Sequence, residues 1–86
     1  MLDRTLIQNQ IVQLMADVME IHVPAIDTDL FNEGFLDSLS YVRLIVELQQ
    51  EFAVTISLGE VDVDQFRTVE QIAEVVISRR AIVVAV

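Results

Sequence analysis

The sequence predicts an all-α fold, a small four-helix bundle with three longer helices and one short helix around a single core. Apolar residues recur at helical spacing in three segments, and each segment opens near a residue suited to cap a helix. The one segment that alternates like a strand has no visible partner, and a lone strand would be marginal. The 86 residues make one domain, 1–86, with one modest core and no room for a deep, walled active site.

A first helix is expected to begin at Asp3 and to end near Ile21 or His22. Asp3 or Thr5 is suited to cap its start, and Pro24 disfavours the helical conformation at the residue before it. The apolar residues of this segment recur at helical spacing, at Ile7, Ile11, Leu14, Met15, Val18 and Met19.

The connection between the first and second helices, residues 23–37, is polar but carries apolar residues at Ile26, Leu30, Phe31, Phe35 and Leu36. A connection with this many apolar residues is expected to lie over the core and to close one side of it. Gly34 supplies a position at which positive φ costs little, just ahead of the next helix.

A second helix is expected to begin at Asp37 or Ser38 and to end near Phe52. The Asp37 carboxylate is a good N-cap, because it can accept a hydrogen bond from the backbone N–H of Leu39 or Ser40. Ser38 then takes the first helical position, with its side chain near solvent. The apolar residues of this helix repeat at helical spacing, at Leu39, Val42, Ile45, Val46, Leu48 and Phe52.

After the second helix, the sequence predicts an extended link, a short helical turn around Gly59 to Val63, and a last helix that opens at Thr68. Thr68 and Gln71 form the pattern of a capping box. The apolar tail, residues 81–86, is expected to continue this helix or to fray along the bundle; the alternative is a docking segment for a partner. The buried stripe of the last helix is expected at Val69, Ile72, Ala73, Val76 and Ile77.

The charge balance is lopsided and argues against some classes of partner, although many small proteins are acidic. Fourteen acidic residues stand against five basic residues, all arginine, for a net charge of -9. This charge would repel nucleic acid and an anionic membrane surface, and it favours basic partner surfaces. The sequence has no cysteine, no apolar run long enough for a membrane span and no recognisable signal peptide. We expect the cytoplasm as its compartment.

The sequence offers little for catalysis or for metal binding. A hydrolase built on Ser38 would need a base, but the only histidine is His22 and the G-x-S-x-G pattern is absent. Residues 27–38 start like a calcium loop, yet Phe31, Asn32 and Ser38 stand where that loop needs a ligand, a glycine and a glutamate. No Cys/His set offers a zinc site. We therefore expect neither catalytic nor metal-binding residues.

A serine at a helix start suits a different use. Its hydroxyl would lie beside free backbone N–H groups and the positive end of the helix dipole. A phosphate ester formed there would be electrostatically tolerated. Ser38 is therefore a candidate attachment point, with the chemistry carried by the attached group.

The stretch "LFNEGFLDSLSYVRLIVELQQEFAVTI", residues 30–56, closely resembles acyl carrier and peptidyl carrier proteins. Their signature is a D/H-S-L/I triplet after a Gly-containing loop, at the start of the second helix of a four-helix bundle. Here the triplet is Asp37, Ser38 and Leu39. The ending "DQFRTVEQIAEVV" is similar to the family's entry into its last helix, so the resemblance covers nearly the whole chain.

The resemblance implies that Ser38 carries 4′-phosphopantetheine, attached to its hydroxyl by a separate phosphopantetheinyl transferase. The thiol at the end of this arm would hold acyl or aminoacyl groups as thioesters. The protein would then shuttle intermediates and would not itself be an enzyme. Its other partners would be an acyl- or aminoacyl-loading ligase, which is an adenylating enzyme, and synthase or transferase domains. It would act as a monomer.

The resemblance also implies residues for partner recognition: Asp37 next to the serine, and the apolar residues Leu39, Val42 and Val46 near the arm. Apolar residues at helical spacing are usually core, and this stays the alternative for Val42 and Val46. Three further residues would be core or would line an acyl pocket, namely Ile56, Val61 and Phe66.

The second helix departs from the carriers of primary fatty-acid synthesis. Those have a strongly acidic helix of the form D-S-L-D-x-V-E-L, and the resemblance implies that their partners present basic patches to it. Here Ser40 replaces the first acid and Arg43 replaces the glutamate. Arg43 is expected to face solvent and to repel such partners; the alternative is an ordinary surface arginine paired with Glu47.

These departures favour a stand-alone carrier of a specialised pathway: polyketide, nonribosomal peptide, or the D-alanyl carriers of cell-wall modification. A housekeeping carrier of fatty-acid synthesis is one alternative. An unmodified helical adaptor, which keeps the fold only as a docking surface, is the other. The intact triplet at residues 37–39 favours the modified carrier over the adaptor.

Overall fold

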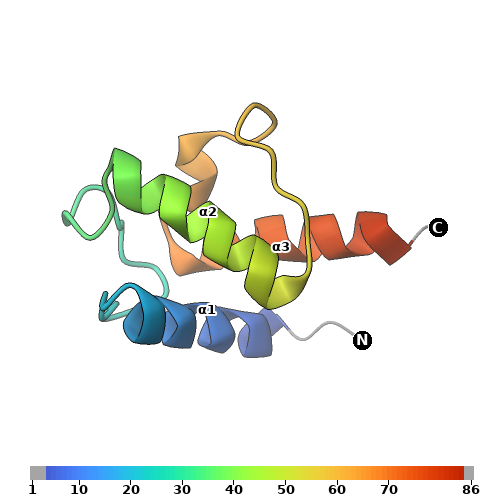
Figure 1. The fold of residues 1–86 in the computed structure, drawn as a ribbon. Helices are drawn as coiled ribbons and strands as arrows, with labels where there is room; N and C mark the ends of the chain where they lie inside the picture. Colours follow the sequence, from blue (N-terminus) through green and yellow to red (C-terminus); the bar gives the residue numbers. More distant parts are fainter. Residues whose placement is uncertain (1–3, 85–86) are drawn as a thin grey trace.

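Residues 4–84 form three α-helices and one short 3-10 helix in the computed structural model, which describes the side chains of residues 4–79. The elements are α1 (Arg4–Val18), α2 (Ser38–Phe52), η1 (Val63–Phe66) and α3 (Val69–Val84). α1 packs most extensively on α3, and α2 runs diagonally across the front of the bundle in Figure 1. No strand occurs between residues 4 and 84, so the all-α prediction is confirmed, with η1 as the short fourth helix.

One apolar core holds these elements together, and within the described side chains no polar or charged residue is buried. Burial of large apolar side chains of this kind contributes about 1.5–3 kcal/mol each. The predicted stripe of α2 omits Leu44, which is fully buried, and includes Leu39, which is 83% exposed. The largest fully buried side chains come from every element: Phe66, Ile7, Ile11, Met15, Leu30, Leu44, Leu48, Ile72, Val69 and Val76.

The end of α1 differs from the prediction of Ile21 or His22, because the helix stops at Val18. Glu20 has φ 58°, a left-handed conformation that cannot continue an α-helix. The backbone N–H of Ile21 then turns back and donates to the Met15 carbonyl at 2.9 Å. At the other end, Thr5 lies inside α1 and is not its cap, while the alternative cap, Asp3, lies outside the described residues.

The loop between α1 and α2, residues 19–37, lies over the core as predicted. Leu30 and Leu36 are buried, and the Leu30 carbonyl accepts from the backbone N–H groups of Phe35 and Leu36 at 2.8 and 3.0 Å. Gly34 adopts φ 82°, the conformation for which the sequence predicts a glycine. In Figure 1 this loop connects the end of α1 to the start of α2 on the side opposite the chain ends.

The link after α2 is extended over residues 54–57, but the short helix lies later than the predicted Gly59 to Val63. A turn occupies residues 58–60 instead, and η1 spans Val63–Phe66. The position of η1 has a local cause, because the Gln65 side-chain Oε1 accepts from the backbone N–H of Asp62 at 2.8 Å. This bond satisfies a donor at the helix start that would otherwise lack a partner.

The start of α3 matches the predicted capping box. The backbone N–H of Gln71 donates to Thr68 Oγ1, and the backbone N–H of Thr68 donates to Gln71 Oε1, each at 3.2 Å. The predicted stripe of α3 faces the core, with Ile77 only partly buried. The helix continues to Val84, which confirms that residues 81–84 of the tail extend it; the last two residues of the tail lie outside the described chain.

Candidate functional site around Ser38

Ser38 occupies the first position of α2 and its side chain is exposed, as predicted. The cap is Asp37, whose Oδ1 accepts from the backbone N–H of Ser40 at 2.9 Å. The Asp37 carbonyl accepts the first helical bond, from the N–H of Tyr41 at 2.8 Å. Buried Leu36 fixes the chain one residue before the cap. Ser38 is thus held at the surface by the buried Leu36 before it and by the two hydrogen bonds of Asp37 to Ser40 and Tyr41.

Two opposite charges meet at Ser38, the positive end of the α2 dipole and the negative cap Asp37. The first turn of α2 contains no acidic residue, and its backbone N–H groups and dipole favour a negative group. The hydrogen bond from the backbone N–H of Ser40 holds the pKa of the Asp37 carboxyl below its ordinary value. The cap is therefore ionised at neutral pH, and its contribution to stability is lost only as the pH falls through the folded-state pKa.

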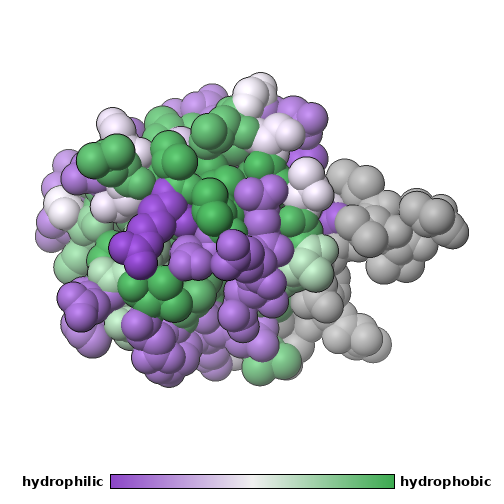
Figure 2. Space-filling view, viewed as in Figure 1, coloured by the Kyte–Doolittle hydropathy of each residue, from purple (hydrophilic) through white to green (hydrophobic). Residues whose placement is uncertain are grey.

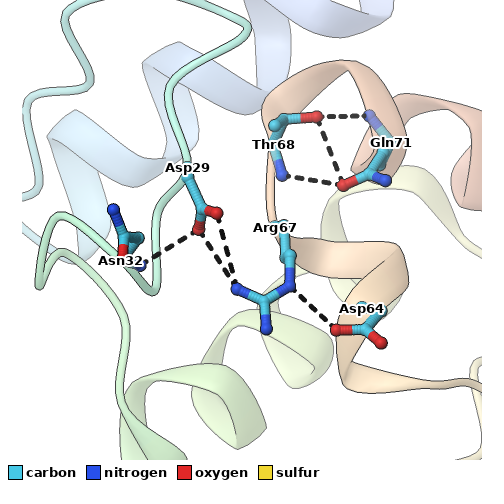
Figure 3. A network of polar contacts seen from close by, with 6 residues as sticks. All are labelled: Asp29, Asn32, Asp64, Arg67, Thr68 and Gln71. Carbon is cyan, nitrogen blue, oxygen red and sulfur yellow. Dashed lines mark hydrogen bonds and ion pairs between the residues drawn. The ribbon is translucent and has the colours of Figure 1, made fainter.

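Arg67 fastens the loop that leads to Ser38, a role that the sequence analysis missed (Figure 3). Its guanidinium pairs with Asp64 at 2.8 Å and with Asp29 at 3.4 Å, and it lies 5.9 Å from the centre of the Phe31 ring. Asp29 also accepts from the backbone N–H of Asn32 at 3.0 Å, and this bond, followed by the charge of Arg67, lowers the pKa of the Asp29 carboxyl. Asp29 therefore takes part in the contacts that hold the loop.

Three aromatic side chains form a layer behind the start of α2. Tyr41 meets Phe66 edge to face, with ring centroids 5.3 Å apart, and meets Phe31 in the same manner at 6.0 Å. Such pairs favour edge-to-face geometry and add to the free energy of burial. Burial, followed by the negative charge of Asp62, raises the pKa of the Tyr41 hydroxyl. This layer joins the loop, α2 and η1 close to the serine.

The outward side of α2, which we call the α2 face, consists of Leu39, Val42, Arg43 and Val46. The three apolar side chains are 83%, 42% and 44% exposed, so the core alternative for Val42 and Val46 is wrong. Arg43 is exposed as predicted, but its guanidinium donates to the Val18 carbonyl at 3.2 Å instead of pairing with Glu47. Apolar and polar side chains lie interspersed on the surface in Figure 2.

The remaining candidate residues lie away from Ser38 or in the core. Ile56 and Phe66 are buried in the core. Val61 is half-buried and lines an open groove of about 620 Å³ between η1 and α3, together with polar side chains such as Gln71 and Glu74. His22 is exposed. Within the part of the chain that the structure describes, no group of three or more His, Asp or Glu side chains could hold a metal ion.

Substitution of Asp37 tests the cap and its charge separately. Asp37→Ala should lower the melting temperature by roughly 4–8 °C, because an N-cap bond is lost. Modification of Ser38 should also be slower in this variant. Calorimetry would measure the melting temperature, and mass spectra recorded at intervals would measure the rate of modification. Asp37→Asn keeps the capping oxygen, so it should melt near wild type yet be modified more slowly. Modification of Asp37→Asn at the wild-type rate would show that only the cap matters.

None of the helices in residues 4–84 is long and apolar enough to cross a membrane.

Comparison with known proteins accounts for this site. The family model for a phosphopantetheine attachment site matches residues 9–76. A D-alanyl carrier protein of Streptococcus mutans serotype c is 35% identical over 69 residues, which are 79% of this chain and 87% of that protein. D-alanyl carrier proteins of Streptococcus pyogenes serotypes M5 and M49 are each 42% identical over 60 residues, 70% of this chain and 71% of theirs.

The matched residues include the whole of the loop, the capped serine and α2, and they end inside α3. The chain therefore belongs to the family of carrier proteins that are built around an attachment site for covalent 4′-phosphopantetheine.

Proposed function

We propose that this chain is an aminoacyl carrier that holds D-alanine, with its 4′-phosphopantetheine arm attached to Ser38. The single observation that carries the attachment point is the exposed hydroxyl at the capped start of α2. The cargo is inferred from the D-alanyl carrier proteins that are 35–42% identical to this chain. The second helix supports the same choice, since it lacks the acidic first turn expected of a housekeeping fatty-acid carrier.

The residues around Ser38 fit the group that they would hold. A phosphate on the hydroxyl would lie at the positive end of the α2 dipole, with no acidic side chain in the first turn and with the Asp37 cap, which already accepts from the Ser40 N–H, beside it. When bound, the group supplies a terminal thiol, which the chain itself lacks because it has no cysteine. The loop held by Arg67 and the layer of aromatic rings keep the attachment point in one place relative to the α2 face.

The partners follow from this role. A phosphopantetheinyl transferase would modify Ser38, a D-alanine-activating ligase would load the arm, and a transferase would accept the cargo. Asp37 and the α2 face are the surfaces next to Ser38 that such enzymes would contact. Loading by an adenylating ligase consumes ATP, so we place this exchange in the cytoplasm. We also propose that the carrier acts as a monomer.

Loading with D-alanine tests the cargo. The protein, modified by co-expression with a broad-range phosphopantetheinyl transferase, would be incubated with ATP, labelled D-alanine and a D-alanine-activating ligase. We expect label bound to the protein, released by neutral hydroxylamine, and no label with L-alanine. The unmodified protein is the matched control. If the protein were loaded only by the malonyl transferase of fatty-acid synthesis, it would instead be a housekeeping carrier. If it could not be modified at all, it would be an adaptor.

A further inference from the structure

Arg43 differs from the other arginines whose side chains the structure describes, because its guanidinium lies beside no carboxylate. Its one bond is to the Val18 carbonyl at 3.2 Å. Glu47, one turn further along α2, forms no ion pair with it. The other three are all paired with acids: Arg4 with Glu74, Arg67 with Asp29 and Asp64, and Arg79 with Glu60.

The position of this unpaired charge is unusual for so acidic a chain. Arg43 is four residues after Leu39 and three before Val46, so the three side chains are neighbours on one side of the helix. That side is the α2 face. Its side chains are exposed, and all of them except Arg43 are apolar. A chain of net charge -9 thus presents a cation, not a carboxylate, on the surface that begins at Ser38.

The bond to Val18 fixes where this cation points. The Val18 carbonyl is at the last residue of α1, where the helix dipole is negative and attracts a guanidinium. A guanidinium has five N–H donors in a rigid fork, and this bond occupies one nitrogen. The remaining donors point into solvent-exposed space, where they can bind a carboxylate.

We propose that Arg43 decides which enzymes dock on the α2 face: it binds those whose apolar docking surface carries a carboxylate opposite it. The same cation disfavours enzymes that present a basic patch, because like charges that face each other across an interface weaken the binding. The inference rests on the proposed function in one respect, namely that partners approach the end of α2 at which Ser38 lies. Arg43 is then a recognition residue and not only a cap for α1.

The first arm of the test measures KM and kcat for loading of the phosphopantetheine-bearing protein by the D-alanine-activating ligase. Arg43→Glu should raise KM by roughly tenfold at low salt with little change in kcat, and less at high salt. Arg43→Gln should show a smaller rise, and Arg43→Lys should keep most of the affinity. The control is Arg79→Gln, which removes an equal charge from α3 and should leave KM unchanged.

The second arm does not need D-alanine. Malonyl transfer to the modified protein by the malonyl transferase of fatty-acid synthesis should be poor with wild type and should improve clearly with Arg43→Glu. If the ligase loads no variant, the D-alanine proposal fails while this arm still decides the role of Arg43. Efficient malonyl transfer to wild type, or no gain with Arg43→Glu, would overturn the inference. So would equal KM across the first series, which would leave Arg43 as a cap for α1 alone.

Discussion

Ser38→Ala should abolish attachment of phosphopantetheine and leave the fold nearly intact. The side chain is exposed at the first position of α2, and the cap bond there is made by Asp37, so the hydroxyl contributes little to stability. Co-expression with a broad-range transferase should add one phosphopantetheinyl mass to wild type and none to the variant. Intact-mass spectrometry measures this result directly, and circular dichroism would confirm that the helices are unchanged.

Ser40→Ala is the matched control, because Ser40 lies two residues further along the same helix turn and alanine keeps the backbone N–H that makes the cap bond. This variant should be modified like wild type. An added mass that persists in Ser38→Ala, or that disappears in Ser40→Ala, would move the attachment point away from Ser38.

Phe66→Ala should cost about 3–5 kcal/mol of unfolding free energy, as is usual when a fully buried phenylalanine is truncated. Phe66 is 0% exposed and is the only fully buried ring in the described core, with Tyr41 against its edge at 5.3 Å. Domains of this size are stable by only about 5–15 kcal/mol, so the loss would remove a large share of the total. Denaturant unfolding followed by circular dichroism would measure it.

Val63→Ala is the control within the same short helix. Val63 is 39% exposed, so its truncation should change the unfolding free energy by no more than about 0.5 kcal/mol. If Phe66→Ala were no more costly than Val63→Ala, η1 would not be anchored by its ring. The layer of aromatic rings behind Ser38 would then depend for its position on the contact between Tyr41 and Phe31 of the loop.

The start of α2 could be predicted from the sequence because every signal there is local. Gly34 tolerates positive φ, Asp37 reaches the backbone two and three residues ahead, and Ser38 follows. The capping box at Thr68 and Gln71 is local in the same sense. Short-range hydrogen bonds of this kind depend on residue type and spacing, which a single sequence displays.

The features that were predicted wrongly or missed depend on contacts between distant segments. Arg43 reaches a carbonyl 25 residues away, and Arg67 reaches Asp29 across 38 residues. Neither partner can be read from spacing along one helix. The early end of α1 depends on Glu20 in a left-handed conformation, which glutamate does not signal as glycine would. Leu39, in turn, is exposed although its apolar spacing suggests core.

Two backbone hydrogen bonds hold the loop, one to the connection between η1 and α3 and one to the start of α3. The backbone N–H of Leu30 donates to the Arg67 carbonyl at 2.6 Å, and that of Glu70 donates to the Ile26 carbonyl at 3.2 Å. The loop that leads to Ser38 is therefore joined to the segment that opens α3 at two points. The serine therefore has a firmly held position, and under the proposed function we expect the movement between partner enzymes to come from the attached group.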